Sequence, residues 1–380
     1  MSAELTVILT GIFAASSCAL VGTFLILRRM AMMADAISHA ILPGLVGAYF
    51  LANGPNLIAG ILGASLAGLA TVILVETLQR SGRVKSDAAI GIVFPALFAL
   101  GTFLISRYFS NVHLDADAVL FGEIAFAPFD RLIIGGTDYG SQPMIVLGFL
   151  TLLNAMLIGM FYKELKLATF DGGLATALGF SPLLIHYGLM TTVSVTTVGA
   201  FAAVGAILVV ALMIVPAATA YLLTNRLPVM IALSVVIGVA SAIFGYYGAV
   251  AFDVSISGMM AVSGGIMFGL ASLFSPEHGI VARSIRRKAQ STSFAVDLLL
   301  MHLNHHASGS ESRTSLEREL NWSSDRLKRV VGAGERDGLL QRSDTHITLT
   351  EQGRSEATNH VLAIQPGDVV TREQVISPTT

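Results

Sequence analysis

An aspartate and a histidine lie four residues apart in an otherwise apolar segment, at Asp35 and His39, and Pro43 follows one turn later. Residues i and i+4 share one face of an α-helix, so the carboxylate and the imidazole would lie side by side. A carboxylate and an imidazole together suit a divalent transition-metal ion. Because ionisable residues inside a membrane segment usually face a cavity and are functional, the pair predicts a metal-binding site.

Pro43 and Ser38 add to this prediction. Pro43 has no backbone N–H, so the carbonyl of His39 loses its normal helical partner. A kinked helix with a freed carbonyl beside two ligands is how membrane proteins build ion sites near the middle of the bilayer. Ser38 would either assist the ion or donate to its own backbone. The alternative for Asp35 and His39 is a helix cap followed by an interfacial histidine.

The composition is that of a polytopic membrane protein. Of the 380 residues, 54% are hydrophobic and 13% are charged, whereas soluble domains average about 25% charged residues. The single cysteine, Cys18, excludes an internal disulfide and a cysteine-rich metal centre. No G-x-x-x-x-G-K-[ST] phosphate loop occurs in the sequence, so the chain is not itself a P-loop ATPase.

Charge divides the chain into two parts. Residues 1–282 carry 10 Lys/Arg and 13 Asp/Glu, whereas residues 283–380 carry 13 and 12 in little more than a third of that length. This contrast predicts a transmembrane domain at 1–282 and a cytoplasmic domain of ordinary soluble composition at 283–365. The last residues, 366–380, are predicted to be a disordered tail.

Hydropathy predicts an all-α membrane domain of nine spans. Since a span needs about 20 apolar residues, the candidates are roughly 5–27, 36–53, 56–78, 87–106, 143–162, 183–201, 203–223, 229–250 and 257–274. Eight is the alternative, because little polar sequence separates the two candidates between 183 and 223. Lysine and arginine follow each odd-numbered span, which predicts an N-terminus outside and a C-terminal domain inside. Glu76 is predicted to be hydrated and His186 to be interfacial.

The long connection at 107–142 contains an apolar stretch at 118–126. Structureless loops of this length are uncommon in compact domains. The stretch therefore predicts an interfacial helix, with a lid or docking surface as the alternative.

A second connection, which we name the coupling segment, covers residues 170–179. Asp171 is positioned to cap a short helix that runs to Ala177 or Leu178, and Gly179 to end it. One alternative is that this helix docks Leu174 into a groove on a cytoplasmic partner. The other is that it is an ordinary connector between two spans. The residue pattern alone favours neither alternative.

Three segments together resemble the permeases of metal-cation ABC importers, the class that transports manganese, zinc and iron. They are residues 28–44, which contain Asp-x-x-x-His-x-x-x-Pro-Gly, residues 170–179 and residues 209–220. Their order and spacing cover most of residues 5–275. One departure is Ala34, where the family pattern leads us to expect glycine.

The resemblance implies one membrane half of an ATP-driven importer, paired with itself or with a similar subunit. A cytoplasmic ABC ATPase would bind the coupling segment, and an extracytoplasmic metal-binding protein would deliver the ion. Asp35 and His39 would line the ion path, supported by Ser38 and Pro43. The residues implied in coupling to the ATPase are Phe170, Asp171, Leu174, Ala177 and Gly179. The cargo would be manganese first, with zinc or iron as alternatives, and no permanently bound cofactor is expected.

Residues 294–365 resemble a winged helix-turn-helix of the kind found in diphtheria-toxin-repressor-like metalloregulators, with three helices, a two-stranded wing near 341–349 and a last helix. The near balance of basic and acidic residues argues against nucleic-acid binding, which depends on neutralising phosphates. A regulatory or assembly role is therefore expected. His302, His305 and His306 would form either a regulatory metal cluster or a solvated turn.

The leading hypothesis is a permease subunit, not an enzyme, surrounded by lipid in the inner membrane of a bacterium. The first alternative is a secondary metal carrier or channel driven by an ion gradient, which would transport without an ATPase. The second is a membrane-tethered regulator that acts through the winged-helix-like domain.

Overall fold

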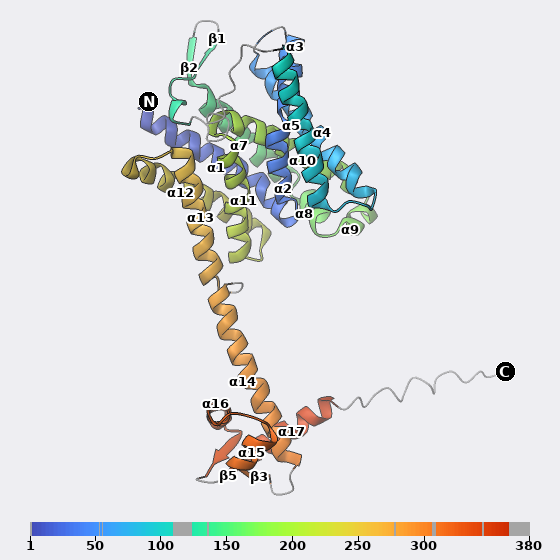
Figure 1. The fold of residues 1–380 in the computed structure, drawn as a ribbon, viewed down its shortest axis with the longest axis vertical. Helices are drawn as coiled ribbons and strands as arrows, with labels where there is room; N and C mark the ends of the chain where they lie inside the picture. The colour runs from blue at the N-terminus through green and yellow to red at the C-terminus, as the bar shows by residue number, and fades with distance from the viewer. Residues whose placement is uncertain are drawn as a thin grey trace, which may run out of the picture. The chain divides into compact units, whose positions relative to one another are not determined.

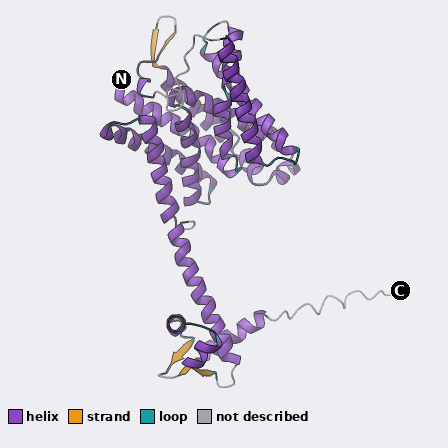
Figure 2. Cartoon of the chain, in the orientation of Figure 1, coloured by secondary structure: helices purple, strands orange, loops and turns teal. Residues whose placement is uncertain are grey.

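The computed structural model describes residues 2–52, 54, 56–108, 124–134, 137–276, 279–305, 309–343 and 346–364. Contacts divide the chain into two compact units, Met1–Gly279 and Ile280–Thr380. Both units are mainly helical, and short strands occur in each (Figure 2). The predicted tail at 366–380 lies outside the described residues.

The helices of the first unit are α1 (Ala3–Leu27), α2 (Ala31–Ala40), α3 (Leu42–Ala52), α4 (Leu57–Arg80), α5 (Ser86–Tyr108), α7 (Gln142–Met160), α8 (Tyr162–Phe170), α9 (Gly172–Ala177), α10 (Pro182–Val204), α11 (Ala206–Leu223), α12 (Leu227–Phe252) and α13 (Ile256–Phe274) (Figure 1). Within the described residues, eight of them are long and apolar enough to cross a membrane, and the bent pair α2 and α3 makes nine if it counts as one span. The prediction of a polytopic, mainly helical membrane unit is therefore confirmed, although the unit also contains two short strands.

The break in the spans lies in the second span and not between residues 183 and 223. The two candidates there are the separate helices α10 and α11, joined at Gly205, which has φ 81°. The predicted span at 36–53 is instead α2 followed by α3, with a bend of 42°. Pro43 explains the break, because it cannot donate to the carbonyl one turn back.

Small residues let the helices of the first unit approach closely. Figure 1 shows α1 among the helices of the second half of this unit, and α1 packs on α7, α11 and α12. A Cβ on Gly22 of α1 would overlap the carbonyl of Met213 on α11. Asn154 of α7 adds a polar link, since its side-chain amide donates to the Ser17 carbonyl at 3.1 Å and to Thr196 Oγ1 at 2.9 Å. Such packing by small and hydrogen-bonding residues is characteristic of membrane helices.

The connection between α5 and α7 contains a β-hairpin that the sequence did not predict. Strand β1 (Arg131–Ile134) pairs antiparallel with β2 (Thr137–Ser141), and an ion pair of 3.2 Å joins Arg131 Nε to Asp138 Oδ2. Most of the predicted interfacial helix at 118–126 lies outside the described residues. Its last three residues form the 3-10 turn η1 (Ile124–Phe126). Figure 1 shows this hairpin and the helices α8 and α9 at opposite ends of the first unit.

The second unit contains α14 (Ile280–His305), β3 (Ser310–Ser312), α15 (Arg313–Glu319), α16 (Ser324–Arg336), β4 (Leu340–Arg342), β5 (His346–Leu349) and α17 (Glu351–Ile364). The strands form one antiparallel sheet in the order β3-β5-β4. A separate core lies beneath them, with Leu299, Leu303 and Trp322 among its members. Helices and a pair of strands, β4 and β5, occur where the sequence predicted them, whereas β3 was not predicted.

Candidate functional site

Asp35 and His39 lie together on α2, as their spacing predicts. His39 Nε2 is 3.4 Å from Asp35 Oδ1, and the two side chains are 32% and 39% exposed, respectively. Every other residue from Met33 to Ala40 is buried. The helix therefore opens to its surroundings on one face only, and that face carries a carboxylate beside an imidazole.

Two phenylalanine rings of α5 lie beside His39. The imidazole centroid is 5.7 Å from the ring of Phe94 and 6.4 Å from the ring of Phe98. A Cβ on Gly101, one helical turn further along α5, would lie 2.5 Å from Leu42 Cβ and 3.0 Å from Pro43 Cδ. Only glycine lets α5 approach the break at this point, so α5 supports both the kink and the imidazole.

The remaining predicted member, Ser38, is engaged elsewhere. Its hydroxyl donates to the carbonyl of Ala34 at 2.9 Å, and the residue is buried. Of the two roles expected for Ser38, the geometry matches the bond to its own backbone. Two side chains are then available to an ion from this chain, which is fewer than the four ligands that zinc takes or the six of an octahedral site.

The coupling segment folds as its sequence indicates. Asp171 caps α9, because its Oδ1 accepts from the backbone N–H of Leu174 at 2.9 Å. Gly179, with φ 86°, ends the turn, and the Phe180 N–H donates back to the carbonyl of Ala175 at 3.0 Å. A residue with positive φ after the last helical turn is the common way for a helix to end.

One face of the coupling segment is apolar and exposed. Phe170, Leu174 and Leu178 are exposed, and so is Ala177, while Ala175 is fully buried against the unit. Ala175 thus anchors the segment, and its other residues are exposed.

A partly buried polar network, which we name the inner network, was not predicted from the sequence. Glu76 of α4 and His186 of α10 form an ion pair with each other, and their side chains are only 13% and 16% exposed. Tyr187 donates to Glu76 Oε2 at 2.9 Å, and Arg28 Nη1 lies 3.1 Å from His186 Nδ1. The prediction of a hydrated Glu76 was wrong, because His186 and Tyr187 provide the partners that allow its carboxylate to be largely buried. The interfacial position of His186 stays a prediction.

Arg28 connects the inner network to α8, which leads into the coupling segment. Its Nε donates to Thr169 Oγ1 of α8 at 3.2 Å, and burial lowers the pKa of this guanidinium below its usual value. The network thus joins the last turn of α4, the residue after α1, the end of α8 and the start of α10. A cavity of about 480 Å³ beside it is lined by residues of the first turn of α2 and of α4 and α5.

Glu76→Ala is expected to destabilise the folded protein. It would leave His186 and Tyr187 without the carboxylate that they contact, and breaking a buried pair costs about 3–5 kcal/mol. The measurement is the thermal unfolding of the full-length protein in detergent. Asp138→Ala is the control, since it breaks the half-exposed pair with Arg131, and a surface pair contributes about 0–1 kcal/mol. Equal shifts in the two variants would contradict the structural role of Glu76.

The predicted histidine cluster of the second unit is only partly described. His302 and His305 lie in the last turns of α14, and His306 is outside the described residues. The imidazole of His302 lies near two carboxylates, those of Glu311 and Glu319, neither of which the sequence analysis selected.

Comparison with known proteins identifies the family. Residues 3–275 match the ABC 3 transport family. The chain is 44% identical to the zinc transport system membrane protein TroD of Treponema pallidum, over 92% of this chain and 97% of TroD. It is 49% identical to the manganese transport system membrane protein MntD of Bacillus subtilis, over 75% of this chain and 97% of MntD.

A solved structure agrees with the sequence relatives. The chain resembles PsaBC from Streptococcus pneumoniae, solved in complex with a Fab, with a TM-score of 0.62 and 31% identity over 75% of this chain and 94% of that chain. The family match covers most of the first unit, including the kinked helix and the coupling segment. The chain therefore belongs to the ABC 3 transport family.

Proposed function

We propose that this chain is the membrane permease subunit of a bacterial ATP-driven importer of a divalent transition-metal ion. Manganese is the leading cargo, with zinc and iron as alternatives, because carboxylate and imidazole ligands do not separate these ions by themselves. The relatives named for zinc and manganese support the same range of cargo. The role is transport, and ATP hydrolysis is expected on a separate subunit.

The observation that carries this proposal is the open face of α2. Asp35 and His39 are the half-exposed residues of an otherwise buried turn. They supply two ligands on one side of a kinked helix, and Pro43 leaves a carbonyl free nearby. A second permease subunit facing the first would add an equivalent pair and bring the ligand number to four. Weak, shared coordination of this kind would also permit release of the ion.

The inner network supports the proposed orientation. The end of α1, the last turn of α4, the end of α8 and the start of α10 meet there through Arg28, Glu76, Thr169 and His186. The positive-inside pattern assigns these ends to the cytoplasmic side. With α2 and α3 as one broken span, nine crossings put the N-terminus outside and residue 280 onward in the cytoplasm.

Two partners follow from the proposed orientation. The exposed apolar face of the coupling segment, on the cytoplasmic side, would dock into a groove of the ABC ATPase. The loops at the other end, including the β1–β2 hairpin, would receive an extracytoplasmic metal-binding protein. Membrane lipid would cover the exposed apolar side chains of the spans that face away from the second permease.

The second unit is proposed to be a winged-helix-like regulatory or assembly module. The order of its elements, with β4 and β5 antiparallel between α16 and α17, supports this assignment. The match to TroD covers 92% of this chain. Because the second unit makes up more than a quarter of the chain, most of this unit falls within the match. Mixed charge on α16, where Asp325 and Glu335 accompany Arg326 and Lys328, argues against a DNA-reading role.

The decisive experiment compares transport with and without an ATPase. The full-length protein is reconstituted in liposomes alone and together with the ABC ATPase that co-purifies with it, and entry of radioactive Mn²⁺ or Zn²⁺ is followed. We expect uptake with the ATPase and ATP, and none without either. Uptake by the permease alone, driven by a proton or sodium gradient, would instead favour a secondary carrier.

A further inference from the structure

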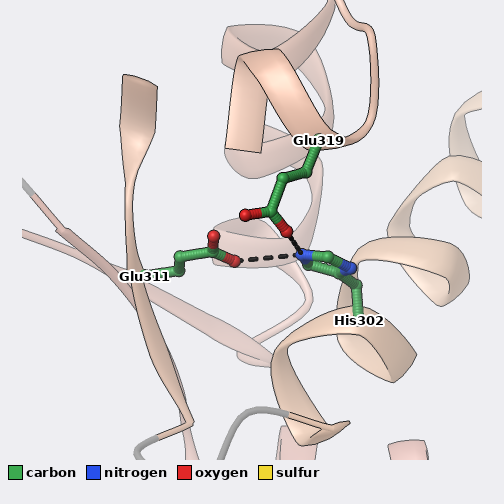
Figure 3. A group of neighbouring side chains, drawn as sticks. All are labelled: His302, Glu311 and Glu319. Atoms are coloured by element: carbon green, nitrogen blue, oxygen red, sulfur yellow. Dashed lines mark hydrogen bonds and ion pairs between the residues drawn. The ribbon is translucent and has the colours of Figure 1, made fainter. Parts of the chain in front are cut away.

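Three ligand-type side chains of the second unit converge on one point (Figure 3). His302 comes from the end of α14, Glu311 from the middle of β3 and Glu319 from the end of α15. His302 Nε2 is 3.0 Å from Glu311 Oε2 and 3.3 Å from Glu319 Oε2. One potential ligand atom from each residue lies within 4.8 Å of the others. Three separate elements therefore direct an imidazole and two carboxylates to the same small volume.

The charges of this cluster favour a cation. Both carboxylates approach the same nitrogen of His302, and that nitrogen carries at most one proton. Glu311 is only 10% exposed, so the repulsion between the two carboxylates is less screened than it would be in open water. An ion with two positive charges between them would offset that repulsion and would use the nitrogen lone pair.

The two distances from His302 to the carboxylates fit the ligand spacing around a transition metal. Bonds of about 2.0–2.2 Å hold adjacent ligand atoms roughly 3 Å apart around a metal ion. The two measured separations, 3.0 and 3.3 Å, match this spacing. A ligand set of one nitrogen and two oxygens suits Mn²⁺, Fe²⁺ or Zn²⁺. Glu319 is 45% exposed, which leaves an open side for entry of the ion and for water ligands.

We propose that His302, Glu311 and Glu319 form a binding site for a divalent transition-metal ion. The site is distinct from the cargo pair, as we name Asp35 and His39 of the first unit, and all of its ligands come from the second unit. Glu311 is fixed by its pairing with Ile347 of β5, so the ion would fasten α15 and the end of α14 to the sheet. On the proposed function, which assigns this unit to the cytoplasm, the site would respond to the level of the imported ion.

The test counts bound Mn²⁺ on the full-length protein in detergent. All proteins carry Asp35→Ala and His39→Ala, so that the cargo pair does not contribute. Equilibrium dialysis with detection by electron paramagnetic resonance is expected to give one Mn²⁺ per chain. The double variant Glu311→Gln/Glu319→Gln and the single variant His302→Gln are expected to bind none at the same concentration.

The matched control is Glu317→Gln on the same helix, two residues before Glu319. Glu317 pairs with Arg313 at 3.4 Å and is not part of the cluster, so this variant should still bind one ion. Binding that survives in the double variant, or that is equally lost in the control, would overturn the site. Circular dichroism of each variant, unchanged from the parent, separates loss of ligands from loss of fold.

The only tryptophan of the chain reports where the ion binds. Trp322 belongs to the core of the second unit and follows Glu319 by three residues. Mn²⁺ is paramagnetic, and we expect it to quench Trp322 fluorescence in the parent protein and in Glu317→Gln, but not in the double variant. Quenching that persists in the double variant would contradict the proposal. If the chain does not transport a metal ion, uptake no longer serves as an assay, but quenching of Trp322 by Mn²⁺ still tests this site.

Discussion

Replacing Asp35 or His39 with alanine is expected to abolish uptake of the metal ion while the permease remains in the membrane. Each substitution would remove one of the two proposed ligands on the open face of α2. Removing a residue that only hydrogen-bonds a metal ligand already costs about 10–100-fold in metal affinity or activity. Loss of a direct ligand should therefore lower uptake by more than about 100-fold. The measurement is ATP-dependent entry of Mn²⁺ into liposomes that contain the permease and its ATPase.

Ser38→Ala is the matched control for this prediction. Ser38 lies on the same helix between the two ligands, but its hydroxyl bonds the carbonyl of Ala34. Uptake by this variant should stay near that of the parent. Stimulation of the ATPase by the permease, measured on the same preparations, shows whether each variant still assembles. Normal uptake in both the Asp35 and the His39 variants would exclude the proposed ligand role.

Local patterns allowed the sequence to predict the pair and the coupling segment. Asp35 and His39 are one helical turn apart, so any helix through both residues brings them together. Asp171 and Gly179 act on the backbone of their own turn, through a cap and a positive φ. Features of this kind depend on a few neighbouring residues, and a single sequence contains all of the information they need.

The inner network could not be predicted in the same way. Glu76 and His186 are more than a hundred residues apart, and only the packing of α4 on α10 makes them partners. Each residue at a span end is compatible with hydration when it is considered alone. The only available signal was that Arg28, Glu76 and His186 all fall at ends assigned to one side of the membrane, which limits where they lie but does not pair them.

The metal site proposed in the second unit shows a related difficulty. Proximity in the chain offered His302, His305 and His306 as a candidate cluster, with a solvated turn as the alternative. The structure pairs His302 with Glu311 and Glu319, which depends on the unpredicted strand β3 and its register with β5. A short strand without an alternating apolar pattern gives little sequence signal.

Leu174→Glu combined with Leu178→Glu is expected to uncouple the permease from its ATPase. Leu174 of α9 and Leu178, which follows the helix, are both exposed, so charge there should leave the permease folded and inserted. Burial of two leucines in a partner contributes about 1.5–3 kcal/mol each, and a buried carboxylate without a partner adds a further cost. We therefore expect co-purification of the ATPase and metal uptake to fall by at least about 100-fold.

Ser86→Glu serves as the control for added charge on the same proposed side of the membrane. Ser86 begins α5 and is exposed, and a negative charge is favourable at a helix N-terminus. This variant should keep the ATPase bound and the metal transported. Because Thr169, beside the coupling segment, accepts a hydrogen bond from Arg28 of the inner network, we propose that movement of a docked ATPase would reach α1, α4 and α10 through this network. Retention of the ATPase by the double leucine variant would therefore reject both the docking face and this path.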